Sequence, residues 1–392
     1  MKKQNKIVVI GGAGHIGLPL SLLLAKRFKV CIVDPSKNVK LIKSKQAPFL
    51  DEGINRYLKN DKIFKNLSFY ENIEKIKLKS LDKFEIAIVT LGTPVDEWGN
   101  PEIQNLEKVF KSLVKFVKPK GFVILRSTVT PGFTKKLSKK FPTLTFAYCP
   151  ERIAQGKSFT ELFSLPQIIG LEKENKKNIN TLKKIFYFSN GYQITDTISA
   201  ELVKLFANFW RYSTFAISNQ IYLISNLFGK SSNNIIDLMK YKYPRIKDIS
   251  KPGLTAGPCL YKDTQQLIAS SKNLCEIGKA AITINEGIIY SLCDDAIKKS
   301  KNKKIIVLGA AFKPNCDDFR DSLSFKIYKH LVRITNKKVI LIDPKVDHPK
   351  VSKNFKLKNY KEYFYIIATP HKEFKDLIKK IPKPNQINIW ED

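Results

Sequence analysis

The feature that most constrains this chain is a glycine-rich turn between an apolar strand pattern and an apolar helix pattern. The segment reads KIVVIGGAGHIG, and Gly12, Gly14 and Gly17 fit the spacing G-x-G-x-x-G. Lys6–Ile10 predicts a buried strand, and Ile16–Phe28 predicts the helix that follows it. Glycine permits the tight turn and lets a pyrophosphate approach the helix N-terminus, where N–H groups and the helix dipole favour anions. The motif therefore predicts a βαβ unit that binds a dinucleotide.

An acidic residue stands where such a unit needs one to recognise a ribose. Val30–Val33 predicts the second strand, and Asp34 follows it, seventeen residues after the last glycine of the motif. A carboxylate there accepts hydrogen bonds from ribose hydroxyls and repels a 2′-phosphate, so we expect NAD rather than NADP, although Lys37 nearby would favour a phosphate. His15 and Ile16, inside the turn, are expected to face the same cofactor.

Polar residues follow two later strand patterns, Glu85–Leu91 and Phe122–Leu125, which are separated by the helix pattern Ile103–Val117. Ligands of doubly wound parallel sheets bind beyond the carboxyl ends of the strands. Three hydroxyl residues are expected to line the dinucleotide site there: Thr93, Ser127 and Thr128. Each of these hydroxyls, taken alone, equally fits a helix cap.

The strand and helix patterns predict an α/β fold in three regions. Residues 1–196 alternate strands and helices, as in a Rossmann-type NAD-binding domain with a parallel sheet. Residues 197–300 are mainly helical, with helices expected at Thr197–Phe228, Asn233–Lys240, Thr264–Ser270 and Leu274–Lys299. Residues 301–392 return to strands and predict a smaller Rossmann-like domain, with strands expected at Lys304–Gly309, Val339–Asp343 and Tyr363–Thr369.

Composition argues against several other classes of protein. The net charge is +34, but only eight of the 69 basic residues are arginine and the lysines are spread along the chain, so we expect no nucleic-acid partner. No apolar run approaches the about 20 residues of a membrane span. The six cysteines include no C-x-x-C pair, so neither a metal site nor a disulfide framework is expected. The polar first five residues leave no room for a signal peptide, and we expect a cytoplasmic protein.

Four longer motifs carry a resemblance to a known family. They are Cys149-Pro-Glu-Arg-Ile-Ala-Gln-Gly156, Ala200-Glu-Leu-Val-Lys-Leu-Phe-Ala-Asn208, Gly253-Leu-Thr-Ala-Gly-Pro-Cys-Leu-Tyr-Lys-Asp263 and Gly309-Ala-Ala-Phe-Lys-Pro-Asn-Cys-Asp-Asp-Phe-Arg-Asp-Ser322. With the glycine motif, and in this order, they resemble the UDP-glucose/GDP-mannose dehydrogenase family over essentially the whole chain. Members of that family oxidise the C6 alcohol of a nucleotide sugar to a carboxylate, which supplies uronic-acid precursors for surface polysaccharide. Cys-Pro-Glu-Arg152 and Tyr-Pro-Arg245 look most like the branch that acts on UDP-N-acetylhexosamines such as UDP-N-acetylmannosamine.

The resemblance implies covalent catalysis by Cys259. Removing two hydrides from an alcohol passes through an aldehyde, which a thiolate retains as a thiohemiacetal and then as a thioester that water hydrolyses. Lys204 and Asn208, at positions i and i+4 on one helix face, would stabilise the oxyanions. Glu151 and Asp263 are the carboxylates available to move protons and activate water, and either fits the role of base.

The resemblance also implies ligand-binding residues and a partner subunit. Thr128 is expected to serve catalysis as well, and Arg320 to approach the NAD from the C-terminal domain. The residues expected to bind the UDP-sugar are Arg152, Lys204, Asn208, Arg245, Gly257, Lys262 and Lys313. The departures from the family's usual pattern around the cysteine are Ala256, Pro258 and Tyr261. A homodimer is expected through Thr197–Phe228, because the apolar residues of that helix extend most of the way round it.

Several alternative interpretations stay open. A two-electron dehydrogenase of the hydroxyacid type shares the Rossmann start and a long middle helix but has no use for Cys259. A basic NAD-sensing or nucleic-acid-binding protein would keep the fold without the reaction. Within the family, UDP-glucose, UDP-N-acetylglucosamine and GDP-mannose are the other substrates considered. Without the resemblance, Lys204 would be assigned to a surface ion pair with Glu201.

Overall fold

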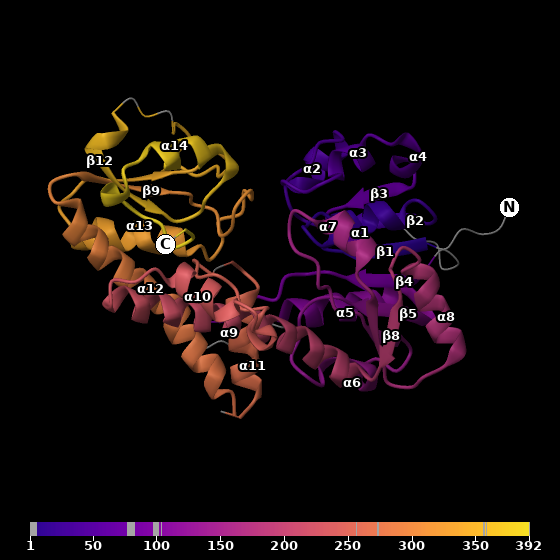
Figure 1. The fold of residues 1–392 in the computed structure, drawn as a ribbon. Coiled ribbons are helices and arrows are strands. Elements are labelled where there is room, and N and C mark those ends of the chain that lie inside the picture. Colours follow the sequence, from indigo (N-terminus) through magenta and orange to yellow (C-terminus); the bar gives the residue numbers. More distant parts are fainter. Residues whose placement is uncertain are drawn as a thin grey trace. The chain divides into compact units, whose positions relative to one another are not determined.

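The computed structural model describes residues 6–76, 83–96, 102, 104–255, 257–272, 274–355, 357 and 359–391. The chain forms two compact units, unit 1 from Met1 to Phe206 and unit 2 from Ala207 to Asp392 (Figure 1). Two positions singled out above, Ile103 and Ala256, lie outside the described residues, as do the first five. None of the described helices combines the length and the apolar character that crossing a bilayer requires.

Unit 1 contains a sheet of eight described strands in the order β3-β2-β1-β4-β5-β6-β7-β8. The strands are β1 Lys6–Ile10, β2 Lys29–Val33, β3 Leu67–Tyr70, β4 Phe84–Val89, β5 Val117–Leu125, β6 Thr145–Tyr148, β7 Gln167–Leu171 and β8 Tyr192–Thr195. The first six pair in parallel, whereas β7 runs antiparallel to β6. The chain builds outward from β1 to β3 and then resumes at β4 on the other side of β1, so ligands are expected at the carboxyl ends of β1 and β4.

Helices cover both faces of this sheet because its strands are apolar on both faces. In β1, Ile7 and Val9 join one buried core, while Val8 and Ile10 join the other. Residues of α1, α7 and α8 complete the first core, and residues of α5 and α6 complete the second. The helices of unit 1 are α1 Gly17–Leu24, α2 Asn38–Lys43, α3 Ile54–Leu58, α4 Asp61–Phe64, α5 Gln104–Phe116, α6 Phe133–Lys140, α7 Ser158–Ser164, α8 Lys176–Ile185 and the 3-10 turn η1 Ile73–Lys75.

The predicted elements of unit 1 differ from the structure mainly at their ends. Lys6–Ile10 is β1 as predicted. The helix expected to reach Phe28 ends at Leu24, because the N–H of Lys26 bonds to the carbonyl group three residues back and tightens the chain into a turn. Val117 begins β5 instead of ending the helix before it. The antiparallel strand β7 was not predicted, since short apolar runs do not distinguish a strand from a buried helix.

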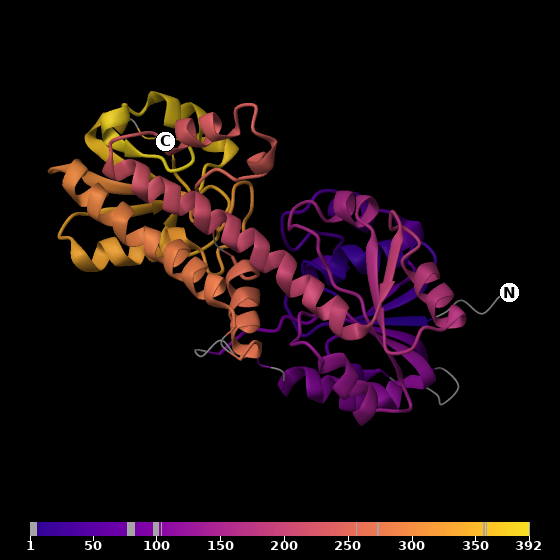
Figure 2. The ribbon, with the colours of Figure 1, turned by 60° about the horizontal axis from the view of Figure 1, so that its bottom comes forward.

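Unit 2 combines long helices with a second sheet, whose described strands all pair in parallel in the order β11-β10-β9-β12-β13. The strands are β9 Lys304–Leu308, β10 Val339–Ile342, β11 Val351–Ser352, β12 Tyr363–Ile367 and β13 Gln386–Ile387. The helices are α9 Thr197–Leu227, which begins in unit 1, α10 Ser232–Lys240, α11 Leu260–Ser270, α12 Glu276–Ser300, α13 Leu323–Ile334, α14 Lys375–Lys380 and the 3-10 turns η3 Pro244–Ile246, η4 Tyr360–Glu362, η5 Lys372–Phe374 and η6 Lys383–Asn385. Within this unit α9 and α12 run side by side (Figures 1 and 2). The predicted order of a Rossmann-type region, a helical region and a Rossmann-like region is confirmed.

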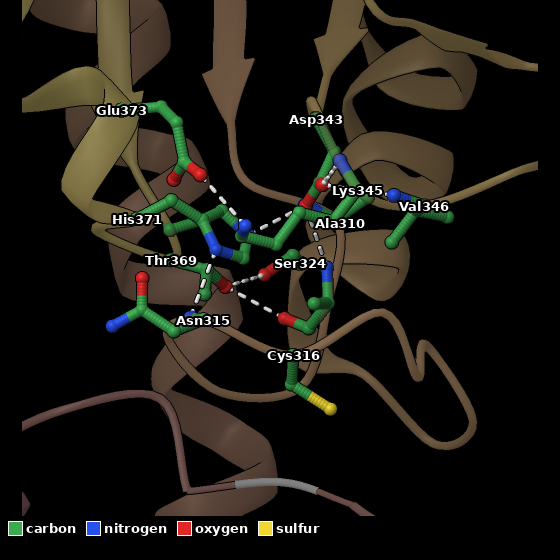
Figure 3. Close-up of polar contacts among 12 residues, drawn as sticks. Ala310, Asn315, Cys316, Ser324, Asp343, Lys345, Val346, Thr369, His371 and Glu373 are labelled. Carbon is green, nitrogen blue, oxygen red and sulfur yellow. Dashed lines mark hydrogen bonds and ion pairs between the residues drawn. The ribbon is translucent and has the colours of Figure 1, made fainter. Parts of the chain in front are cut away.

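Three loops at the carboxyl edge of the C-terminal sheet meet at one buried carboxylate, Asp343 (Figure 3). It accepts hydrogen bonds of 2.7–3.1 Å from four backbone N–H groups, those of Ala310, Ala311, Lys345 and Val346. His371, from the loop after β12, contributes a further bond of 2.8 Å between its Nε2 and Oδ2 of Asp343, and both side chains are fully buried. Asp343 therefore joins the loops that follow β9, β10 and β12.

The second ring nitrogen of His371 is also occupied. Its Nδ1 accepts the N–H of Asn315 at 3.0 Å, so the proton resides on Nε2, which donates to Asp343. Burial acts to raise the pKa of Asp343, but the hydrogen bond from His371 and the backbone N–H donors outweigh it and lower the pKa to about 2. The carboxylate is thus held ionised inside the sheet edge.

Replacing Asp343 by Asn is expected to destabilise the protein by about 1–3 kcal/mol at pH 7, because the new amide would point N–H groups at N–H donors. For a unit of this size, each kcal/mol lowers the melting temperature by about 2–4 °C. The folded pKa lies below the ordinary 3.8, so the stabilisation is complete above about pH 4 and is lost as the pH falls toward 2. Thermal melts of variant and wild type should therefore differ more at pH 7 than at pH 3.

Asp347→Asn provides the matched control, because that side chain is 95% exposed and pairs with Lys353 at the surface. Its melting temperature should stay at the wild-type value. An Asp343→Asn protein that loses as much stability at pH 3 as at pH 7 would contradict this account.

Candidate active site

The glycine motif forms the turn between β1 and α1 that the sequence predicts. A Cβ on Gly17 would lie 2.2 Å from the carbonyl oxygen of Gly11 and 2.6 Å from the Cα of Gly12, so only glycine fits. In α1, which is described throughout, the first turn holds no acidic residue and no capping side chain. Its earliest N–H groups and its dipole therefore face any anion that enters. The partly exposed residues of the turn are Gly14, His15 and Ile16.

Asp34 lies against this turn at the end of β2. Its Oδ2 accepts the N–H of Ala13 at 3.0 Å, and its Oδ1 accepts the N–H of Ser36 at 2.9 Å. Because each carboxylate oxygen can accept from two donors, Asp34 retains capacity for ribose hydroxyls. The turn and the carboxylate together fit the dinucleotide that the sequence predicts. Among the described residues, no cluster of His, Cys, Asp or Glu is arranged to hold a metal ion.

The three hydroxyl residues expected at the neighbouring strand ends come together. The hydroxyl of Thr93 donates to the carbonyl oxygen of Thr128 at 2.7 Å, which ties the segment after β4 to the segment after β5. Ser127 is buried, and its hydroxyl lies 3.5 Å from the carbonyl oxygen of Val89 at the end of β4. The structure thus places Thr93, Ser127 and Thr128 at the carboxyl edge of the sheet, as predicted.

Glu151 is buried and has both oxygens engaged. Its Oε2 forms an ion pair with Arg126, and its Oε1 accepts the N–H groups of Arg152 and Ile153 at 2.9 and 3.2 Å. Arg126 is also buried and donates to the side chain of Gln167 at 2.9 Å. Arg126 carried no predicted role, although it directly precedes Ser127 and Thr128 in the sequence. The contacts make Glu151 and Arg126 the anchor of the loop that follows β6.

Two further carboxylates complete the support of this loop. Asp51 accepts the N–H groups of Gly156 and Ser158 at 2.9 and 3.1 Å and the hydroxyl of Ser158 at 2.6 Å. Glu161 accepts the N–H of Ala154. The guanidinium group of Arg152 donates to the carbonyl oxygen of Pro166. Asp51 stands more than one hundred residues before its partners, so no local sequence pattern could have found it.

Lys204 and Asn208 lie one turn apart on α9, as predicted. The alternative of a surface ion pair between Glu201 and Lys204 is wrong, because Glu201 is fully buried. Its carboxylate accepts the N–H groups of Gly132 and Thr134 at 2.5 and 2.8 Å and the hydroxyl of Thr134 at 2.6 Å. Burial raises the pKa of Glu201. Glu201 holds the start of α9 to the loop before α6, and Lys204, almost one turn further along the helix, is half-buried.

Exposure separates Cys259 from the buried cysteines. Cys259 is exposed and directly precedes α11, whereas burial raises the pKa of the thiols of Cys31, Cys149 and Cys293 to about 12. Cys316 is buried as well. A thiol must be accessible and able to ionise to act as a nucleophile. The structure therefore favours Cys259 over these four.

A buried polar cluster lies one helical turn from Cys259. Asp263 is 1% exposed, and its N–H donates to the carbonyl oxygen of Cys259 at 2.9 Å. The amide of Asn208 donates to Oδ2 of Asp263 at 2.6 Å, and the ammonium of Lys262 lies 2.7 Å from its Oδ1. Four residues predicted for the site are thus brought together within unit 2.

Four further predicted residues lie in unit 2, namely Gly257, Arg320, Lys313 and Arg245. Gly257 has a φ of +105°, and a Cβ there would lie 2.5 Å from the ring of Phe312. Arg320 donates to Asp318, and this hydrogen bonding, with a smaller contribution from Cys259, raises the pKa of its guanidinium group. Lys313 lies over the ring of Phe312, 5.7 Å from its centroid. Arg245 is exposed on η3 and lies 3.3 Å from the hydroxyl of Tyr243.

The mostly parallel sheet and the glycine turn beside the carboxylate of Asp34 are the construction of a Rossmann-type dinucleotide-binding domain. Residues 5–188 match the NAD binding domain of the UDP-glucose/GDP-mannose dehydrogenase family, residues 198–287 its central domain and residues 306–389 its UDP binding domain. The chain therefore belongs to the UDP-glucose/GDP-mannose dehydrogenase family. The predicted family, its oxidoreductase class and its cofactor NAD are confirmed.

Named relatives agree with this assignment. The UDP-N-acetyl-D-mannosamine dehydrogenase of Methanocaldococcus jannaschii is 30% identical over 84% of this chain and 77% of the relative. The enzyme of the same name from Pyrococcus horikoshii is 28% identical over 94% of this chain and 90% of the relative. A solved structure of the UDP-D-ManNAc dehydrogenase from Pyrococcus horikoshii matches with a TM-score of 0.83 and 26% identity, covering 98% of this chain and 93% of that chain.

Replacing Asp34 by Asn is expected to narrow the preference for NAD over NADP by about tenfold or more, because the charge that repels a 2′-phosphate is removed while the side chain keeps its size. The measurement is kcat/KM for each cofactor in the wild type and the variant. Asp61→Asn, which removes an exposed carboxylate paired with Lys45, should leave the ratio unchanged. Equal kcat/KM for the two cofactors in the wild type would refute the assignment of Asp34.

Proposed function

We propose that this protein oxidises the C6 alcohol of UDP-N-acetylmannosamine to the carboxylate, in two hydride removals, through a covalent bond to Cys259. The observation that carries the proposal is the accessible Cys259 at the start of α11, one turn from the buried Asp263–Asn208–Lys262 cluster. A two-electron dehydrogenase would need no nucleophile at that position. The names of the relatives support the choice of sugar.

When bound, NAD supplies the acceptor for each of the two hydrides. The first removal converts the C6 alcohol to an aldehyde and releases a proton. The thiolate of Cys259 then adds to the aldehyde carbon, and the oxygen takes up a proton to give a thiohemiacetal. The second removal, with loss of the hydroxyl proton, leaves a thioester. Water cleaves the carbon–sulfur bond, which yields the carboxylic acid and returns the thiol.

The buried cluster supports a division of roles between the two carboxylates. Asp263 is attached to the segment that carries Cys259, so we assign it the activation of water at the thioester. Glu151 binds Arg126 and two loop N–H groups. We therefore assign it the role of positioning the loop that follows β6 and the water at that loop. Lys204 and Asn208 supply positive charge and an amide N–H to the oxygen that becomes negative at C6. Thr128 supplies a hydroxyl to the same chemistry.

The ligand assignments follow the three regions 1–196, 197–300 and 301–392, which we propose as the NAD-binding, the central catalytic and dimerisation, and the UDP-sugar-binding domains. The residues proposed to bind NAD are Gly12, Gly14, His15, Ile16, Gly17, Asp34, Thr93, Ser127 and Arg320. The residues proposed to bind the UDP-sugar are Arg152, Lys204, Asn208, Arg245, Gly257, Lys262 and Lys313. A cytoplasmic location and a role in making polysaccharide precursors are part of the proposal.

A homodimer through α9 is also part of the proposal. Beyond the face buried within its own chain, α9 carries exposed apolar side chains, among them Trp210 at 68% and Leu227 at 84% exposure. Others on this helix are Phe206, Ile217 and Ile224. Exposed apolar groups of this size favour a protein partner, and a second copy of the same helix would cover them.

Counting NADH per sugar tests the reaction directly. The wild type supplied with NAD and UDP-N-acetylmannosamine should form two NADH and one carboxylate per sugar, and UDP-glucose should react more slowly. Cys259→Ala should form no acid, because no thioester can be made. The matched control Cys275→Ala changes a half-buried cysteine outside the proposed site and should keep the ratio of two. A ratio of one, or acid formed by Cys259→Ala, would reject the covalent route.

A further inference from the structure

Helix α9 is bonded to the cysteine-bearing segment at two points. We call the segment from Gly253 to Asp263 the strap; within it, residue 256 lies outside the described part of the chain. At one end, Asn208 donates to Asp263. At the other end, Oδ1 of Asn219 accepts the N–H of Gly253 at 2.9 Å, and its Nδ2 donates to the carbonyl oxygen of Gly253 at 3.1 Å. The two asparagines are eleven positions apart in the helix, so they share one helix face about 16 Å apart.

A second asparagine fixes the orientation of the Asn219 amide. Nδ2 of Asn219 also donates to Oδ1 of Asn285 on α12 at 2.9 Å, and Nδ2 of Asn285 donates to the carbonyl oxygen of Tyr212 at 3.0 Å. Both asparagines are fully buried. Turning either amide over would set donors against donors and acceptors against acceptors inside the buried core. The network therefore has one arrangement, and it includes both backbone groups of Gly253.

Two aromatic rings also restrict the positions of two glycines of the strap. A Cβ on Gly253 would lie 2.7 Å from the ring of Trp390, and one on Gly257 would lie 2.5 Å from the ring of Phe312. Trp390 is itself held, because its indole N–H donates to the carbonyl oxygen of Ala368 at 3.1 Å. Gly253 and Gly257 thus pack directly on two rings, and the two ends of the strap are hydrogen-bonded to α9, with Cys259 between these ends.

We infer that Asn219 and Asn285 are positioning residues for Cys259. This inference rests on the proposed function, in which the thiolate must capture the aldehyde before it leaves. Displacing a reacting group by about 1 Å can cost about a hundredfold in rate. The first hydride removal does not use Cys259, whereas capture depends on where its sulfur stands. If the strap is loosened, the aldehyde should therefore escape after the first hydride removal. The rates of all steps should not fall equally.

The test measures NADH, carboxylate and free aldehyde per UDP-sugar consumed, with an aminooxy reagent to trap the aldehyde. For Asn219→Ala we expect fewer than two NADH per sugar, with the shortfall recovered as trapped aldehyde and with KM for NAD unchanged. Asn285→Ala leaves both bonds to Gly253 in place and should show the same defect to a smaller extent. It also provides the measurement if Asn219→Ala does not fold.

Asn226→Ala is the matched control. Asn226 lies on the same helix and also reaches α12, where it donates to Asp295 at 3.0 Å, but this bond is at the surface and does not touch the strap. This variant should keep two NADH per sugar without free aldehyde. Folded Asn219→Ala or Asn285→Ala protein that keeps a ratio of two, even at reduced total activity, would overturn the inference, because a purely structural defect lowers the number of active molecules and leaves the ratio intact. A wild-type ratio other than two would instead reject the proposed function.

Discussion

The buried carboxylate of Asp263 sets the geometry on which the proposed chemistry depends. A carboxylate that is 1% exposed is tolerated only when charge and hydrogen bonds compensate for the lost water. Here Lys262 and Asn208 provide that compensation. The strap cannot separate from α9 without losing the hydrogen bond that Asn208 donates to this buried carboxylate. The hydrogen bond from Asn208 therefore holds the first turn of α11 to α9 and, directly before that turn, Cys259.

The two Rossmann-type sheets use one construction for different purposes. In each, an aspartate follows the second strand and binds the turn after the first strand. Asp34 accepts one N–H on each oxygen, which leaves capacity for a ligand. Asp343 accepts four N–H groups and the ring of His371, which leaves none. Asp34 can thus accept hydrogen bonds from a ribose, whereas Asp343 holds together the loops at the edge of its own sheet.

Sequence patterns predicted the parts of this structure that depend on local chemistry. The glycine turn, Asp34 and the strand ends followed from residues close together in the chain. The predicted C-terminal end of α1 was wrong only because the chain tightens into a turn there. Glu201 received no role from the sequence beyond the alternative of a surface pair with Lys204, because its partners lie 67 and 69 residues away. Asn219 and Asn285 carried no signal, since an amide that binds backbone groups 34 residues distant leaves no periodic pattern. Cys259 was identified by resemblance, and its exposure is an independent physical reason for the same assignment.

The most direct test of covalent capture is the mass of the peptide that contains Cys259. Asp263→Asn keeps the size of the side chain but removes the base proposed to activate water, so the thioester should accumulate. After mixing with NAD and the UDP-sugar and rapid quenching, this peptide should gain the mass of the UDP-sugar acid less one water. An Asp263→Asn enzyme that turns over at the wild-type rate, with the peptide unmodified throughout, would contradict the account.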